Sequence, residues 1–358
     1  MNMKIEQSAK LISYSVLVLA IIASGAVLLI ARDFIYPIFL AILNSYLIFP
    51  LVKFFERKFR LSGVAIFASI IIAVIVSIGI FFILYQQFSV FIDDFPQFQD
   101  QALINLTEVQ NFISEKSSFS FRSDDWLKDQ ITNLLKAQED FIAQVFSATT
   151  ATLVALGVQP VYVFFMLYYR HHFREFLFQI TSPKAYGTLK TILNQISSVT
   201  NNYVTGIFIV VIILCFVNSL GLIIVGIEYA IFFGIISAIV NLIPYFGTLI
   251  GGSIPLLYTL VSPEPSNAIG VIILFIIVQI LENNILTPNI TGGRVAINPL
   301  FTIFSIILGG LAWGIPGMFL SVPFLGIFKI ICENIKVLQP VSFLLSSKNS
   351  PKENGEII

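Results

Sequence analysis

Eight stretches without a charged residue divide the chain, and they set its expected architecture. Each reaches or approaches the roughly 20 apolar residues with which an α-helix crosses the ~30 Å hydrocarbon core of a bilayer. The alternating ten-residue segments typical of a transmembrane β-barrel do not dominate. We therefore predict an all-α polytopic integral membrane protein with about eight transmembrane segments. The charge-free stretches are 11–31, 34–52, 61–92, 141–169, 191–227, 229–263, 265–281 and 295–328.

The overall composition agrees with this pattern. Hydrophobic residues make up 57% of the chain, charged residues make up 11%, and the mean hydropathy is +0.91. A soluble domain has roughly 45–50% apolar and about 25% charged residues, because charged side chains coat its surface. The hydropathy predicts membrane lipid among the partners, and the formal net charge of zero predicts no nucleic acid.

The distribution of charge predicts the orientation. Loops rich in Lys and Arg stay in the cytoplasm. Residues 86–150 instead carry ten acidic and four basic residues, so we place this segment outside the cell membrane. Both termini are then cytoplasmic. The basic residues that carry this prediction are Lys4, Lys10, Lys53, Arg57, Lys58, Arg60, Lys329 and Lys336.

The same pattern suggests five segments along the chain. An apolar stripe from about Ser123 predicts an amphipathic helix in the outer segment, either packed on the protein itself or used to capture a solute. Ser182 and Pro183 are typical of a helix start, followed by a helical elbow at the cytoplasmic surface. The predicted segments are 1–92 (hairpin and third span), 93–148 (outer helix), 149–205 (fourth span and elbow), 206–338 (transport core) and 339–358 (tail).

Two charge-free stretches are too long for one straight crossing. As a single helix, 229–263 would measure about 52 Å. Both this stretch and 295–328 contain helix breakers, and their similar order of apolar helix, Ile-Pro and Gly-rich bend suggests a weak internal repeat; compositional bias is the alternative. Whether each stretch crosses the membrane or re-enters on one side stays open. The residues of interest are Asn241, Pro244, Gly247, Gly251, Gly252, Pro255, Gly309, Gly310, Pro316, Gly317 and Pro323.

Broken helices favour a substrate pathway. An unpaired backbone group in hydrocarbon costs several kcal/mol, so a break is tolerated where protein or a polar cavity shelters it. The alternative is a glycine-mediated packing face with a harmless kink. If the pathway interpretation is right, Gly251→Leu or Pro244→Ala leaves the protein folded in membranes but stops solute movement.

A polar cluster separates the two broken stretches, within QILENNILTPNITGGRVAINP (279–299). A carboxylate and amides at this depth could bind a hydroxylated solute or accept a proton. The alternative is the ordinary return of polar residues at the end of a span. The cluster and its helix breakers are Glu282, Asn283, Asn284, Pro288, Gly292, Gly293 and Pro299.

Three segments carry a resemblance to a known family: LIPYFGTLIGGSIP, VQILENNILTPNITGGRVAINPL and LGGLAWGIPGMFLSVP. In order and spacing they resemble the autoinducer-2 exporter family of bacterial permeases. The resemblance implies an inner-membrane permease that exports a small signalling molecule of the autoinducer-2 type, and a homo-oligomer, with a pentamer as one arrangement. Asn298 and Ile207 depart from the family pattern. The family motifs fall on Pro244, Gly247, Glu282, Asn283, Pro288, Gly310, Gly317 and Pro323.

The leading hypothesis is a permease that moves a small polar solute through a site formed by the broken stretches and Glu282. A sodium or proton antiporter is the alternative, with oxygens of Glu282 and nearby amides binding the cation. The chain lacks H-E-x-x-H, G-x-S-x-G and P-loop motifs, so we predict no enzyme, catalytic residue or cofactor. His171 and His172 follow a span and suggest headgroup-level polarity, so no metal is predicted. A non-transporting scaffold is the last alternative.

Overall fold

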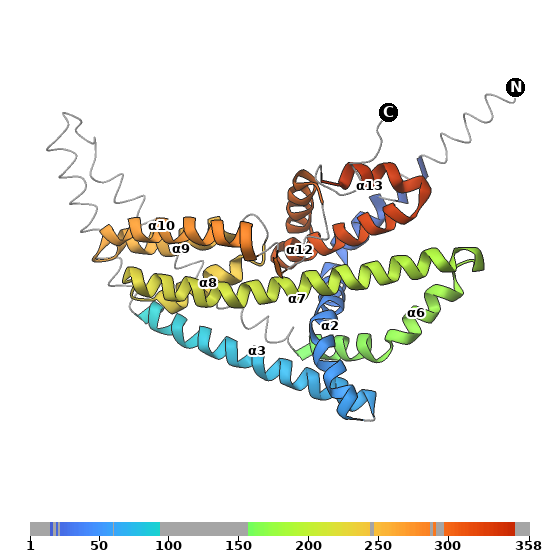
Figure 1. Cartoon of the computed structure of the whole chain (residues 1–358), viewed down its shortest axis with the longest axis horizontal. Coiled ribbons are helices and arrows are strands. Elements are labelled where there is room, and N and C mark those ends of the chain that lie inside the picture. Colours follow the sequence, from blue (N-terminus) through green and yellow to red (C-terminus); the bar gives the residue numbers. More distant parts are fainter. Residues whose placement is uncertain are drawn as a thin grey trace, which may run out of the picture. The chain divides into compact units, whose positions relative to one another are not determined.

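The protein is helical throughout the part of the chain that the computed structural model describes (Figure 1). The described residues are 15–16, 19–20, 22–59, 61–93, 157–243, 247–286, 289–290 and 297–347. Within these ranges the β-structure is limited to one isolated bridge between Ile297 and Ser346. The all-α prediction is confirmed.

Five of the described helical segments are long and apolar enough to cross a membrane: Arg32–Lys58, Ser62–Phe91, Pro183–Val225, Pro265–Leu286 and Pro299–Asn334. Shorter apolar helices lie between them, including Gly157–Tyr168, Ala230–Val240 and Leu249–Val261. This set confirms the prediction of a multi-pass membrane protein. The named helices that form it are α2 (Arg32–Lys58), α3 (Ser62–Asp93), α7 (Tyr186–Val225), α10 (Ala268–Leu281) and α12 (Pro299–Asn334).

The chain divides into two compact units that interleave along the sequence. One comprises 1–45, 172–200 and 295–358, and the other comprises 46–171 and 201–294. We call them the outer-sequence unit and the central unit, after their places in the chain. Each is described by itself.

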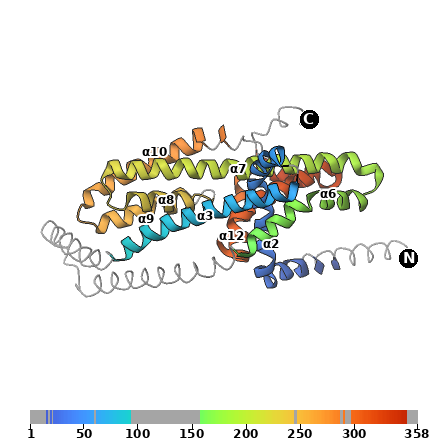
Figure 2. The ribbon, with the colours of Figure 1, turned by 90° about the horizontal axis from the view of Figure 1, so that it is seen from below.

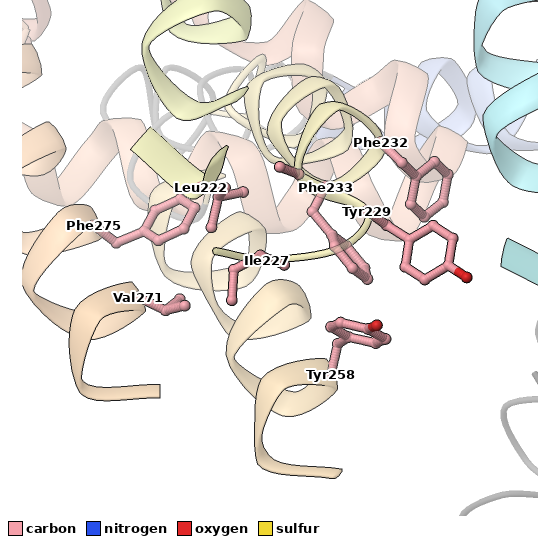
Figure 3. Close-up of a cluster of buried hydrophobic side chains, with 9 residues drawn as sticks. Leu222, Ile227, Tyr229, Phe232, Phe233, Tyr258, Val271 and Phe275 are labelled. Atoms are coloured by element: carbon pink, nitrogen blue, oxygen red, sulfur yellow. The ribbon is translucent and has the colours of Figure 1, made fainter. Parts of the chain in front are cut away.

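The central unit packs α8 (Ala230–Val240) and α9 (Gly247–Val261) with α10 and the second half of α7. Figures 1 and 2 show α8 and α9 beside α7. Apolar and aromatic side chains join these helices in one cluster, in which Phe275 lies beside Leu222 and Phe233 faces Tyr258 (Figure 3). The cluster consists of Leu222, Ile227, Tyr229, Ala230, Phe232, Phe233, Tyr258, Val271 and Phe275. Close packing stabilises this cluster. The hydrophobic effect does not drive helices together in a bilayer, because lipid tails are as apolar as the side chains.

The outer-sequence unit contains α12, followed by the 3₁₀ turn Lys336–Leu338 and α13 (Gln339–Leu345). The backbone N–H of Asn298 donates to the carbonyl oxygen of Leu345 at 2.8 Å, which ties the start of α12 to the end of α13. The Asn298 side chain also accepts from the N–H of Leu300 at 3.0 Å and so caps α12, whose first residue is Pro299. This start matches the preference of helices for an Asn cap followed by proline.

The predicted elbow and the fifth span form one helix. After α6 (Arg170–Gln179) and the 3₁₀ turn Pro183–Ala185, α7 runs for 40 residues without interruption. Residues 188–205 contain neither Gly nor Pro, so nothing in the sequence stops the helix there. Ser182 occupies the predicted position before Pro183, but its hydroxyl forms no capping hydrogen bond.

Several predictions concern residues outside the described ranges. They include the outer amphipathic helix within 94–148, the tail from 348, and four residues of the predicted pathway: Pro244, Pro288, Gly292 and Gly293. These remain predictions.

Candidate functional site

The first broken stretch is a helical hairpin formed by α8 and α9, which we call the first hairpin. A Cβ atom added at Gly251 would lie 2.7 Å from the carbonyl oxygen of Ser237, and one added at Gly247 would overlap Asn241. Contacting positions rise along one helix and fall along the other, so the two helices run antiparallel. At ~1.5 Å per residue they are about 16 and 22 Å long, too short to cross a ~30 Å core alone. The stretch therefore turns back on itself.

Ser237 repairs a backbone defect that proline creates in this hairpin. Pro255 has no N–H, so the carbonyl oxygen of Gly251, four residues earlier, loses its helical donor. The hydroxyl of Ser237 donates to that oxygen from α8. The helix consequently continues through Pro255 without the break that the sequence suggested, and α9 extends from Gly247 to Val261.

The turn of the first hairpin carries the polar centre of the site. Asn241 caps the end of α8 and is 9% exposed. Its Nδ2 atom donates to Oε1 of Glu282 at 2.6 Å, and Glu282 stands directly after α10. A charge-assisted bond of this length is among the stronger hydrogen bonds in proteins. It joins the break in the hairpin to the polar end of a neighbouring helix.

Only part of the predicted polar cluster takes part in this contact. Glu282 to Leu286 form a π-helical turn, a geometry that often marks functional sites. Asn283 and Asn284 are exposed, and Nδ2 of Asn284 donates to the carbonyl oxygen of Ile280 at 2.9 Å within the same helix. The structure thus brings Glu282 to the hairpin turn. It does not bring Asn283 or Asn284 there.

Gly251 and Gly252 are packing positions. The added Cβ at Gly252 would lie 3.0 Å from the ring of Phe275 on α10. A leucine at Gly251 would have to displace the backbone of Ser237. The close contact therefore argues against the expectation that Gly251→Leu leaves the fold intact, because glycine is what lets the two helices approach.

The second broken stretch is also a hairpin, formed within α12, and we call it the second hairpin. Trp313 (φ −133°, ψ 15°) and Gly314 (φ 64°, ψ −143°) leave the helical conformation and separate two arms. Gly309 and Gly317 face each other across the arms so closely that a Cβ on either would overlap the other's backbone. Gly310 likewise faces Met318, and Pro316 begins the second arm. Pro323 lies within that arm, and the helix continues through it.

Trp313 at this turn makes contacts that the sequence analysis missed. Its Nε1 atom donates to the carbonyl oxygen of Leu28 at 3.0 Å, and its ring stacks on Phe39 with centroids 5.7 Å apart. Phe39 also meets Phe324 edge-on at 4.7 Å. The signal in the sequence was a tryptophan directly before Gly-Ile-Pro, since the indole N–H of Trp usually finds an acceptor.

The two hairpins belong to different compact units: the first with Glu282 to the central unit, the second to the outer-sequence unit. Among the predicted pathway residues, Asn241 and Glu282 form a hydrogen bond, and Gly309 and Gly317 are in close backbone contact. Ser237 was missed. A small polar residue inside an otherwise apolar helix, ahead of a proline-bearing helix, would have indicated it.

A second polar cluster in the central unit joins the ends of four helices. Nη2 of Arg170 and the hydroxyl of Ser62 both donate to Oε1 of Glu56, at 2.8 and 2.6 Å. Together with Phe59, Leu167, Tyr168 and His171 they line a cavity of about 370 Å³. In the described part of the chain, His171 belongs to no group of three or more His, Cys, Asp or Glu side chains able to hold a metal.

Comparison with known proteins gives a consistent result. A family model described as "AI-2E family transporter" matches residues 16–336. The Bacillus subtilis "Putative transport protein YueF" is 28% identical over 312 residues, 84% of each chain. The Escherichia coli "Putative transport protein YhhT" is 23% identical over 324 residues, 88% of each chain. The Escherichia coli "AI-2 transport protein TqsA" is 30% identical over 123 residues, 34% of this chain and 36% of TqsA.

Proposed function

The chain belongs to the AI-2E transporter family, and from that premise we propose that it exports a small hydroxylated signalling solute of the AI-2 type. One relative, TqsA, is named for AI-2 transport. We place the protein in the bacterial inner membrane because it resembles bacterial inner-membrane permeases, and we place both termini in the cytoplasm because of the loop charges. The observation that carries the proposal is the bond between Asn241 and Glu282 at the turn of a re-entrant hairpin.

This pair suits a hydroxylated solute. The Glu282 carboxylate accepts hydrogen bonds from hydroxyl groups, and the Asn241 amide both donates and accepts. The two side chains bond to each other in this structure, so a solute has to replace a bond that already exists. Re-entrant helices that meet at a polar turn are a common way to place a binding site inside a membrane.

Transport in vesicles tests the proposal. Inside-out and right-side-out membrane vesicles carrying the protein would be loaded or mixed with AI-2, and its movement followed by mass spectrometry. Glu282→Gln removes the charge and Asn241→Ala removes the amide. We expect each to lower the rate by about tenfold or more, because a hydrogen bond to a charged group is worth about 1.5–3 kcal/mol and about 1.4 kcal/mol is a factor of ten.

The chain offers a matched control. Nδ2 of Asn267 donates to Oε2 of Glu264 at 3.0 Å, so this is a second Asn–Glu pair, but it is exposed in a turn. Glu264→Gln should leave the rate unchanged. Transport that survives both Glu282→Gln and Asn241→Ala would refute the assigned site.

A cation antiporter is the second candidate, favoured by the same carboxylate. Between Glu264 and Glu333 no acidic residue other than Glu282 occurs in the sequence. A carboxylate within a membrane protein can carry a proton or, with amide oxygens, a sodium ion. Sodium-driven movement of protons in vesicles, abolished by Glu282→Gln, would support this candidate; sodium that changes nothing would exclude it.

A further inference from the structure

The buried face of α7 carries a polar side chain that its surroundings do not satisfy. Asn218 is 2% exposed, and its Oδ1 atom has no hydrogen-bond partner among the described residues. Leu214 and Leu222, four residues to either side, belong to two apolar clusters of the central unit. An amide enclosed in apolar surroundings without a partner is unfavourable, so packing alone does not account for it.

Tyr203 repeats the feature on the same helix. Its hydroxyl oxygen is enclosed and also lacks a partner within the described part of the chain. At 100° per residue, positions 203 and 218 lie about 60° apart around α7 and so share one face. Between them on that face stand Val210, Val211 and Leu214, all buried.

The Asn241–Glu282 pair lies level with the middle of this face. Leu214 clusters with Ala238 of α8 and Val278 of α10, whereas Leu222 clusters with Phe233 and Val271. Positions therefore rise along α7 as they fall along α8 and α10, and both of these helices run antiparallel to α7. Asn241 and Glu282 stand one turn beyond Ala238 and Val278, which sets them beside Val210 and Val211.

Three polar groups therefore follow one another along this face of α7: Tyr203, the Asn241–Glu282 pair, and Asn218. We call these three groups the row. The outer two are each roughly 10 Å from the middle one along α7, at ~1.5 Å per residue. Apolar side chains separate them. In this structure α8 also packs directly against α7 near the row. At Gly234 an added Cβ would meet the N and Cα atoms of Ser219.

We infer that Asn218 and Tyr203 bind the transported solute on the two sides of the Asn241–Glu282 pair, and that this solute is neutral and rich in hydroxyl or carbonyl groups. The inference rests on the proposed function and extends its site. Amide and phenol groups each donate and accept, so they match hydroxyls and carbonyls. The row contains one charged group, Glu282, which disfavours an anion and gives a second cation no counter-charge.

Two conservative variants test the inference, with AI-2 and radiolabelled D-ribose, a neutral polyhydroxylated probe, as solutes. Asn218→Leu keeps the branched shape and the number of side-chain heavy atoms and removes the amide, and Tyr203→Phe removes only the hydroxyl. We expect the KM for transport to rise by up to about tenfold in each, the fold-change that corresponds to one lost hydrogen bond to a solute. We expect the Tm of the purified protein to stay the same or rise, because an unsatisfied polar group leaves an apolar core.

Thr259→Val is the matched control. Thr259 is fully buried, but its Oγ1 atom donates to the carbonyl oxygen of Pro255 at 2.7 Å. Its loss should lower the Tm and leave the KM unchanged, the opposite of the two test variants.

The outcomes separate this inference from the function on which it rests. An unchanged KM in both Asn218→Leu and Tyr203→Phe, with transport still slowed by about tenfold or more in Glu282→Gln, overturns the row and keeps the proposed site. A lowered Tm with unchanged KM also overturns it, since that result assigns both residues to packing. Absence of Glu282-dependent transport in the wild type overturns the proposed function together with the row.

Discussion

The two hairpins solve the same problem, an interrupted helix inside a membrane protein, in different ways. The first closes with side-chain hydrogen bonds: Ser237 to the Gly251 carbonyl within the hairpin, and Asn241 to Glu282 at its turn. The second closes with backbone contact between Gly309 and Gly317, and an aromatic side chain, Trp313, marks its turn. A polar turn can exchange partners with a solute, whereas a glycine contact can only pack. Under the proposed function, the first hairpin therefore binds the solute and the second has a structural role.

The largest expected effect comes from the glycine contact. Gly309→Ala places a methyl group inside the backbone of Gly317 and the hydroxyl of Ser321, so the arms must separate. We expect the free energy of unfolding to fall by about 3 kcal/mol or more, the upper range for overpacking. Reversible unfolding in detergent would measure this.

The control for that variant is a glycine with room around it. A Cβ at Gly79 of α3 would have nothing within 4 Å. Gly79→Ala should therefore raise the stability by roughly 0.5–1 kcal/mol, as in an ordinary helix. Equal effects at both glycines would show that close contact does not hold the second hairpin together.

A smaller effect is expected at the proline of the first hairpin, and it can be reversed. Ser237→Ala leaves the Gly251 carbonyl without a donor, at a cost of about 1–3 kcal/mol. Adding Pro255→Ala restores an N–H at position 255, which can then donate to that carbonyl. We expect the double variant to be more stable than Ser237→Ala alone, with thermal unfolding as the measurement.

That rescue is specific to the proposed cause. If Ser237 stabilised the hairpin by packing, the two substitutions would act independently and their effects would add. An additive double-mutant cycle would therefore contradict the account of Pro255.

The sequence predicted this contrast only in part. The position of both breaks followed from helix length and from Pro and Gly, because charge-free stretches of 35 and 34 residues each exceed one crossing. The partners did not follow. Asn241 and Glu282 are 41 residues apart, and only the antiparallel packing of α8 and α10 on α7 brings them together. Likewise, a proline in the sequence indicates that one helical hydrogen bond is lost. The group that donates in its place, here the Ser237 hydroxyl, comes from the neighbouring helix and could not be identified from the sequence.

The smallest expected effect concerns Trp313 at the turn of the second hairpin. Trp313→Phe removes the donor to the Leu28 carbonyl and keeps a ring that can stack on Phe39. We expect a loss of about 0.5–1.5 kcal/mol, the net contribution of one hydrogen bond, and no change in transport KM. Stability would be measured by thermal unfolding and transport in the vesicles used for Glu282→Gln. A raised KM with unchanged stability would give the second hairpin a part in solute binding, and the division of roles between the hairpins would no longer hold.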